Sequence, residues 1–219
     1  MGDGVRIRTA VPGDHDAVAR LLVGLYALEA PGMVRGPARG QVELARRMVA
    51  STPVGSRLVL ERDGQVVAMG SLATAEQPRP STPASVVLGA PAVLGPVHGL
   101  RTILGAARGL LSVAGPPTAA EAQLHSFVVD EQSRGQGLGG RLLARLEDDA
   151  RAQGRTGVVL QVVTSNEAAR AFYLAHGYRA LADRPPVIGR LLGYPSVLMR
   201  KDLRPATGSS SPDAPDRAR

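Results

Sequence analysis

The sequence predicts one α/β (α+β) domain in which helices cover both faces of a mixed, mostly antiparallel central sheet. Stretches with strand periodicity and helix periodicity alternate along the chain, and Asp63-Gly64 is a strong signal for a tight hairpin between two strands. A strand, helix, strand unit then spans residues 124–163. A chain of 219 residues is long enough to bury such a core without cross-links.

The first part of the chain predicts a strand, two helices and a hairpin. Val5–Thr9 alternates apolar and polar residues as a strand does, and Ala17–Tyr26 repeats its apolar residues at helical spacing. A second helical pattern lies within Gly36–Ala50. Arg57–Glu61 and Gln65–Ala73 flank the hairpin turn, so we expect these two strands to pair antiparallel.

The later part predicts two helices among four strands. The helices are expected at Leu138–Gln153 and Asn166–Ala175, and Gly177 suits the left-handed residue that ends many helices. The strands are expected at Leu124–Val129, Val158–Val163, Tyr178–Leu181 and Ser196–Lys201.

Residues 76–120 are expected to be an atypical apolar insertion. No acidic residue occurs from Gln77 to Ala120, and Gly99–Val113 has the pattern of an amphipathic helix. Prolines interrupt the uncharged stretch, so we expect a helix packed over the sheet or against a second subunit of a homodimer, and no membrane span. Residues 1–203 would then form the domain, and the apolar-poor residues 204–219 a disordered tail.

Composition disfavours several classes of function. The chain has no cysteine and only four scattered histidines, which argues against a metal site or a thiol nucleophile. The formal charge of +7 comes from arginines spread along the chain, with two phenylalanines and no tryptophan, so nucleic acid is not an expected partner. The N-terminus lacks the pattern of a secretory signal, and we therefore expect a cytoplasmic protein.

The segment 127–140 predicts a site for an anion. A buried strand leads through a polar turn into glycines that open a helix, and the first amides of a helix attract negative charge. Gly135, Gly137 and Gly140 also match the dinucleotide fingerprint. Five polar residues separate them from the strand, however, and the next strand ends without an acidic residue, so a dehydrogenase is a weaker hypothesis.

In these residues the sequence resembles the GNAT superfamily of N-acetyltransferases. The family's acetyl-CoA signature is an Arg or Gln, two residues, Gly, one residue, then Gly or Ala, and it is matched by Arg134, Gly137 and Gly139. A second family pattern is matched by Asn166, Ala168, Ala169, Tyr173, Gly177 and Tyr178. The resemblance is strong over Leu124–Leu181, and before residue 74 it extends only to the order of elements.

The resemblance implies roles for the matched residues toward acetyl-CoA. Backbone groups of Phe127, Val128 and Val129 would pair with its pantetheine arm, and Asn166 would contact the cofactor. The pyrophosphate would bind the amides of Gly135, Gln136, Gly137, Leu138, Gly139 and Gly140, beside the cation of Arg134. Tyr173 would lie near the thioester sulfur, on the same helix face as Asn166 because residues seven apart differ by only about 20°.

The resemblance further implies direct attack by a primary amine on the thioester. That reaction needs an oxyanion donor, an acid for the leaving thiolate and a base, for which the Val129 amide, Tyr173 and His125 are candidates. Each side chain has a structural alternative: Asn166 as a helix cap, Tyr173 as a core residue and His125 as a bystander. The alternative for the whole protein is a non-catalytic acyl-CoA-binding regulatory module.

The acceptor pocket is expected from the segment Tyr26–Arg39 and from the region of Tyr194, where the resemblance fades. Glu29 could attract a cationic amine, although a single carboxylate in a loop is usually solvated. The sequence leaves the class of acceptor amine open.

Overall fold

The computed structural model describes residues 4–30, 35–53, 57–110, 115–181 and 194–203. The strands in these segments are β1 (Val5–Thr9), β2 (Arg57–Arg62), β3 (Gln65–Ala73), β4 (Glu121–Val129), β5 (Gly157–Val163), β6 (Arg179–Ala180) and β7 (Ser196–Asp202). The helices are α1 (His15–Glu29), α2 (Ala38–Ala50), α3 (Ala84–Leu88), α4 (Ala90–Leu94), α5 (Pro96–Leu110), α6 (Leu138–Ala152) and α7 (Glu167–Ala175). The predicted closing strand at 178–181 is reduced to the two residues of β6.

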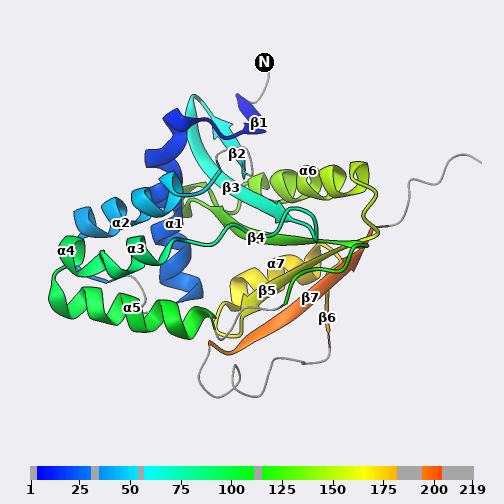
Figure 1. Cartoon of the computed structure of the whole chain (residues 1–219). Helices are drawn as coiled ribbons and strands as arrows, with labels where there is room; N and C mark the ends of the chain where they lie inside the picture. Colours follow the sequence, from blue (N-terminus) through cyan, green and yellow to red (C-terminus); the bar gives the residue numbers. More distant parts are fainter. Residues whose placement is uncertain (1–3, 31–34, 54–56, 111–114, 182–193, 204–219) are drawn as a thin grey trace, which may run out of the picture.

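The strands of the described chain form one seven-stranded sheet in the order β1-β2-β3-β4-β5-β7-β6 (Figure 1). Neighbouring strands pair antiparallel except β4 and β5, which are parallel. The predicted mixed, mostly antiparallel sheet is therefore confirmed. A dinucleotide fingerprint belongs to a mostly parallel sheet. The antiparallel pairing therefore argues against the dehydrogenase hypothesis.

Both faces of the sheet are buried by helices. Val59 and Met69 pack with α1 and α2, whereas their neighbours Leu60 and Ala68 pack with α6 and α7 on the opposite face. All four side chains have an exposed fraction of 0%. Because successive residues of a strand point to opposite faces, a strand covered on both sides needs a continuous apolar run, as β2 and β3 have.

The apolar insertion forms α3, α4 and α5 and packs against α2. Leu44 of α2 forms a small buried cluster with Ala90 and Leu94 of α4. The helices approach closely at Gly40, where a Cβ would lie 2.6 Å from the carbonyl oxygen of Val93. The helical character agrees with the sequence: α5 covers most of the predicted helix, and it packs mainly against α4 and α3.

The outer surface of the insertion remains apolar. Five large side chains of α3 and α5 are 57–77% exposed: Leu88, Val97, Leu100, Leu104 and Leu110. Whether a second subunit covers them, as the sequence suggested, stays a prediction. None of the helices in the described segments has the length and apolar character to cross a membrane. The predicted tail at 204–219 lies outside the described residues.

Candidate functional site

The candidate site begins at a bulge in the middle of β4. Ser126 and Phe127 together face the single residue Gly70 of β3, and Ser126 has a φ of 53°, which is unusual for a residue other than glycine. A Cβ at Gly70 would lie 2.7 Å from Leu146 and 3.0 Å from Phe127. Glycine at this position therefore provides the space into which the bulged strand turns Phe127.

The bulge changes the direction of the side chains that follow it. Leu124 packs on the α6 side of the sheet, yet Val128, four residues later, packs on the α1 side. In a regular strand these two residues would share a face, because side chains alternate with a period of two. The extra residue thus turns the end of β4 toward α1.

Beyond the bulge, β4 parts from β5 and leaves a free strand edge. Their parallel pairing ends at Leu124 and Leu160, although β4 continues to Val129 and β5 to Val163. The opposite edge of β4 remains paired with β3 as far as Val129. An extended ligand placed in this opening could therefore hydrogen-bond to the last residues of β4 as an added strand does.

The turn that follows β4 presents the first amides of α6. Gly135 and Gly137 have φ values of 74° and 75°, in the left-handed region, and a Cβ on either would have nothing within 4 Å among the described atoms. The first main-chain bond of α6 runs from the amide of Arg141 to the carbonyl of Gly137 at 3.1 Å. The amides of Leu138 to Gly140 precede that bond and are therefore available to an anion.

Gly139 and Gly140, the later glycines of the motif, are needed for close packing between helices. A Cβ at Gly139 would lie 3.3 Å from Phe172, and one at Gly140 would lie 3.0 Å from Nε2 of His176. Phe172 lies on α7 and His176 directly follows it, so these two glycines allow the end of α7 to pack closely against the start of α6. Gly135 and Gly137, in contrast, face open space.

Arg134 and Gln136 border the same turn. The Nε of Arg134 donates to the carbonyl of Val129 at 3.1 Å, and Gln136 donates to the carbonyl of Gln132 at 3.2 Å and accepts from Arg62. A cleft of about 270 Å³ lies between α1 and the end of β4. It is lined by Arg20, Leu21, Gly24, Ala27, Leu28, Val128, Val129, Asp130, Glu131 and Arg134.

Asn166 caps α7 and also contacts α1. Its Oδ1 accepts from the amide of Ala169 at 3.2 Å, and its Nδ2 donates to Oε1 of Glu29 at 2.7 Å. The cap that the sequence offered as an alternative is therefore present. A cofactor contact through the side chain of Asn166 would have to replace one of these two bonds.

Glu29 has a closer relation to the site than the sequence indicated. Burial raises the pKa of its carboxyl, and hydrogen bonds from Asn166 and from the backbone of Val163 oppose that shift. The sequence left Glu29 in a loop, whereas the structure makes it the last residue of α1. In the sequence it was marked only by its charge and by its place within the expected acceptor segment Tyr26–Arg39.

Tyr173 is 7% exposed and belongs to an aromatic cluster at the opening between β4 and β5. Its ring centroid lies 6.1 Å from that of Phe127 and 5.5 Å from that of Tyr178. Burial raises the pKa of the Tyr173 hydroxyl, and the charge of Glu29 raises it further. The hydroxyl therefore keeps its proton near neutral pH, and it lies within electrostatic reach of Glu29.

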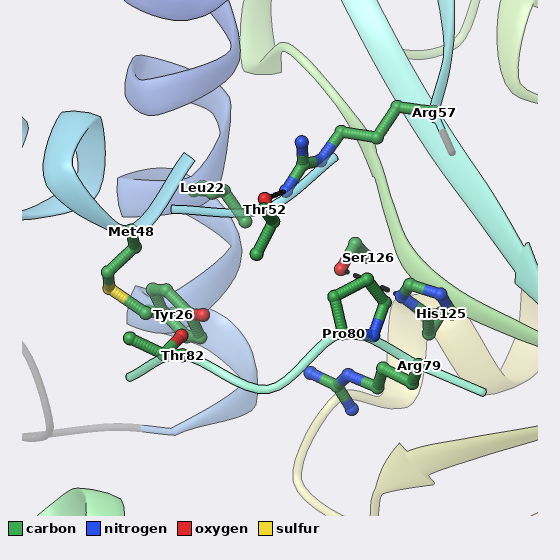
Figure 2. Close-up of a pocket in the computed structure, with 10 residues that line it drawn as sticks. All are labelled: Leu22, Tyr26, Met48, Thr52, Arg57, Arg79, Pro80, Thr82, His125 and Ser126. Atoms are coloured by element: carbon green, nitrogen blue, oxygen red, sulfur yellow. Dashed lines mark hydrogen bonds between the residues drawn. The ribbon is translucent and has the colours of Figure 1, made fainter. Parts of the chain in front are cut away.

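His125 lies in a second, smaller pocket of about 50 Å³ on the α1 side of the bulge (Figure 2). Its Nδ1 is 3.2 Å from Oγ of Ser126, and its buried Nε2 has no partner among the described residues. Burial, and then the charges of Arg79 and Arg57, lower the pKa of His125 to about 3. The imidazole is therefore neutral at pH 7 and a weak base, so its predicted catalytic role stays a prediction.

The structure thus separates the predicted residues into three groups. Residues 127–129 end β4, and residues 134–140 form the following turn and the start of α6; of these, Val128, Val129 and Arg134 line the cleft. Asn166 caps α7 and Tyr173 lies on it, whereas His125 faces the second pocket. The described residues contain no group of three or more acidic or histidine side chains suited to a metal ion.

Comparison with known sequences gives two matches. The profile of the acetyltransferase (GNAT) family matches residues 25–178. The uncharacterized protein ML0378 from Mycobacterium leprae is 40% identical over 84 residues, which are 38% of this chain and 22% of that protein. The chain therefore matches only about a fifth of the length of this relative.

Solved structures share the fold over most of the chain. An acetyltransferase with 25% identity has a TM-score of 0.56, covering 91% of this chain and 100% of that one. An N-acetyltransferase from Staphylococcus aureus Mu50 has 16% identity and a TM-score of 0.60, with 89% and 99% covered. YncA from Salmonella typhimurium, solved with its cofactor acetyl-CoA, has 19% identity and a TM-score of 0.52, with 96% and 98% covered.

Proposed function

Because the chain belongs to the GNAT acetyltransferase family, we propose that it transfers the acetyl group of acetyl-CoA to a primary amine. One observation carries the proposal: the free edge of β4, from the bulge to Val129, ends beside the open amides at the start of α6. A ligand with an extended amide chain next to a diphosphate fits that combination. Residues 1–203 are proposed as the transferase domain.

Acetyl-CoA would be held by the free edge of β4 and by the start of α6. Backbone groups of Phe127, Val128 and Val129 would pair with the pantetheine arm, whose amides supply complementary donors and acceptors. The open spaces beside Gly135 and Gly137 would let the pyrophosphate approach the amides of α6, next to the guanidinium of Arg134. YncA, a protein of the same fold, is solved with acetyl-CoA, which supports this choice of ligand.

When bound, acetyl-CoA supplies an activated acyl group, and the chain has to move two protons and stabilise one oxyanion. The amide of Val129 is the proposed oxyanion donor, because it ends the free edge of β4. Tyr173 is the proposed acid: its raised pKa keeps the hydroxyl protonated, so it can donate to the leaving thiolate.

For the base we propose Glu29 ahead of His125. A base is more effective when its pKa approaches the working pH, and burial raises the pKa of Glu29 while it lowers that of His125 to about 3. Glu29 also lies within electrostatic reach of Tyr173. A carboxylate beside the acid would attract the cationic form of an amine and accept its proton.

Release of free thiol from acetyl-CoA tests the proposed reaction. The full chain is incubated with acetyl-CoA and a panel of primary amines, and CoA binding is measured separately by calorimetry. We expect CoA to bind and at least one amine to release thiol well above the hydrolysis background. Binding of CoA without thiol release for any amine would instead favour the non-catalytic acyl-CoA-binding module.

A further inference from the structure

The pocket beside the β4 bulge presents hydrogen-bond donors without an acidic side chain. Arg57 enters it from the start of β2, Arg79 from the segment after β3, and His125 from β4 (Figure 2). Hydroxyl groups of Tyr26 on α1 and of Thr82 also lie in its wall. None of the ten described residues that line the pocket is a carboxylate.

The two arginines give this pocket a positive potential. Neither takes part in an ion pair of the described residues, and Arg57 donates to the neutral hydroxyl of Thr52. Burial raises the pKa of Tyr26 and lowers that of His125; the charges of Arg79 and Arg57 oppose the first shift and add to the second, so both cations act on residues of the pocket wall. The guanidinium of Arg57 is half-buried without a counterion among the described residues, which is costly, and a bound anion would offset that cost; Arg79 is exposed and would add charge from the rim of the pocket.

The size of the pocket limits the group that it can hold. Its volume is about 50 Å³, which leaves room for a small polar group. A carboxylate fits this space, and its two oxygens suit the planar fork of an arginine. The remainder of a substrate would extend from the pocket toward the thioester on the other side of the bulge.

We infer that this pocket binds a carboxylate of the acceptor, so that the substrate is a small aminocarboxylic acid held by Arg57 and Arg79. The inference rests on the proposed acetyl transfer and names the acceptor class for it. The neutral His125 contributes Nε2 as a hydrogen-bonding group toward the same carboxylate. His125 is thus part of the binding surface, while proton removal is left to Glu29.

Matched pairs of acceptors test this inference. Each α-amino and β-amino acid is compared with its amide, which keeps the amine and loses the negative charge, and with the corresponding aminoalkyl phosphonate. Thiol release is measured for the wild type, Arg57→Gln, Arg79→Gln and the control Arg101→Gln, which removes an exposed cation on α5 outside the pocket. Calorimetry with CoA is run on every variant, so that loss of the proposed function is detected separately.

We expect kcat/KM for the preferred acid to exceed that of its amide by about 10- to 100-fold, the range for a charged hydrogen-bonded contact. In Arg79→Gln and Arg57→Gln the ratio should fall to about 3 or less, and in Arg101→Gln it should persist. Because Arg79 is exposed, Arg79→Gln should keep the stability of the wild type. Four results obtained with normal CoA binding would overturn the inference. They are equal rates for acid and amide, a preference for the acid that survives in both pocket variants, a preference for phosphonates, and no turnover of any acid. Failure to bind CoA would reject the proposed function and the inference together.

Discussion

Asn166 donates from Nδ2 to Oε1 of Glu29 at 2.7 Å, which joins the first turn of α7 to the last turn of α1 across 137 residues of sequence. The same side chain caps α7 through Oδ1. The side-chain amide of Asn166 therefore orients the carboxylate of Glu29. It does so at the opening between β4 and β5, where α7 also presents Tyr173. This arrangement is the basis for assigning a base and an acid to one region.

Glu29→Gln should lower kcat by about 10²- to 10⁴-fold, the usual contribution of a general base. The amide keeps the shape of the side chain and can still accept from Asn166. Because the base acts deprotonated and burial raises its pKa above 4.5, wild-type kcat should fall as the pH decreases through that raised pKa. The variant should lose this acid limb in a pH series of thiol release.

His125→Gln is the control for the assignment of the base. Its kcat should retain the acid limb, while KM for the acceptor rises because a wall of the small pocket has changed. Loss of the acid limb in His125→Gln together with its retention in Glu29→Gln would transfer the role of base to His125.

Glu29→Gln should also raise stability at neutral pH. A carboxyl whose pKa is raised on folding contributes stability that is complete below its unfolded pKa and is lost as the pH rises through the folded pKa. The Glu29→Gln variant has no such loss. The difference in Tm between the variant and the wild type should therefore be larger at pH 8 than at pH 4. Thermal unfolding at the two pH values checks the sign, and an equal difference at both would contradict the raised pKa.

Tyr173→Phe should lower kcat by at least about 10-fold while the Kd for CoA changes by less than about 3-fold. Phenylalanine keeps the ring packed against Phe127 and Tyr178, so the overall fold should be preserved. Thiol release and calorimetry on the same preparation separate the two effects. An unchanged kcat would leave Tyr173 as a core residue only.

Gly137→Ala should weaken CoA binding by at least about 10-fold, because its methyl group would occupy the open space beside the first amides of α6. The left-handed φ of 75° also costs about 1–2 kcal/mol of stability for a residue with a Cβ. Calorimetry with CoA and urea denaturation measure these two effects.

Gly154→Ala is the matched control for that change. Gly154 follows the other end of α6, has a φ of 73° and also faces space without a described atom within 4 Å. It should lose similar stability and bind CoA as the wild type does. A similar loss of CoA affinity in both variants would mean that backbone strain, and not the site, causes it.

Gly70→Ala should destabilise the fold by about 1–3 kcal/mol, because the new methyl group overlaps Leu146 and Phe127. Displacement of Phe127 should also raise KM for acetyl-CoA. Gly109→Ala, at the next-to-last residue of α5, is a control that should not destabilise: no described atom lies within 4 Å of its Cβ, and alanine favours a helix over glycine by at most about 0.5–1 kcal/mol. Equal stability of Gly70→Ala and the wild type would show that the bulge does not depend on glycine.

The elements that the sequence predicted correctly are those with a local signal. Periodicity located the helices and strands around the sheet, and the glycine run marked the start of α6 because a left-handed turn requires that residue type. The bulge had no such signal, since a serine with positive φ is not apparent from composition. The contact between Glu29 and Asn166 also escaped prediction, because a hydrogen bond across so many residues depends on the completed fold.

The packing of the insertion was predicted only in part. Amphipathic spacing indicated a helix at α5, but it could not tell which apolar surface that helix would approach. One residue on which the packing of the insertion depends is Gly40 of α2, whose missing side chain admits the backbone of α4. From the sequence, Gly40 was only one of 26 glycines.

A crystal structure of the full chain with acetyl-CoA tests the central claim most directly. We predict that the pyrophosphate accepts hydrogen bonds from the amides of residues 137–140 and that the pantetheine arm pairs with residues 127–129 on the edge of β4 that faces β5. Acetyl-CoA bound elsewhere, or a side chain closing that edge in the complex, would contradict the account.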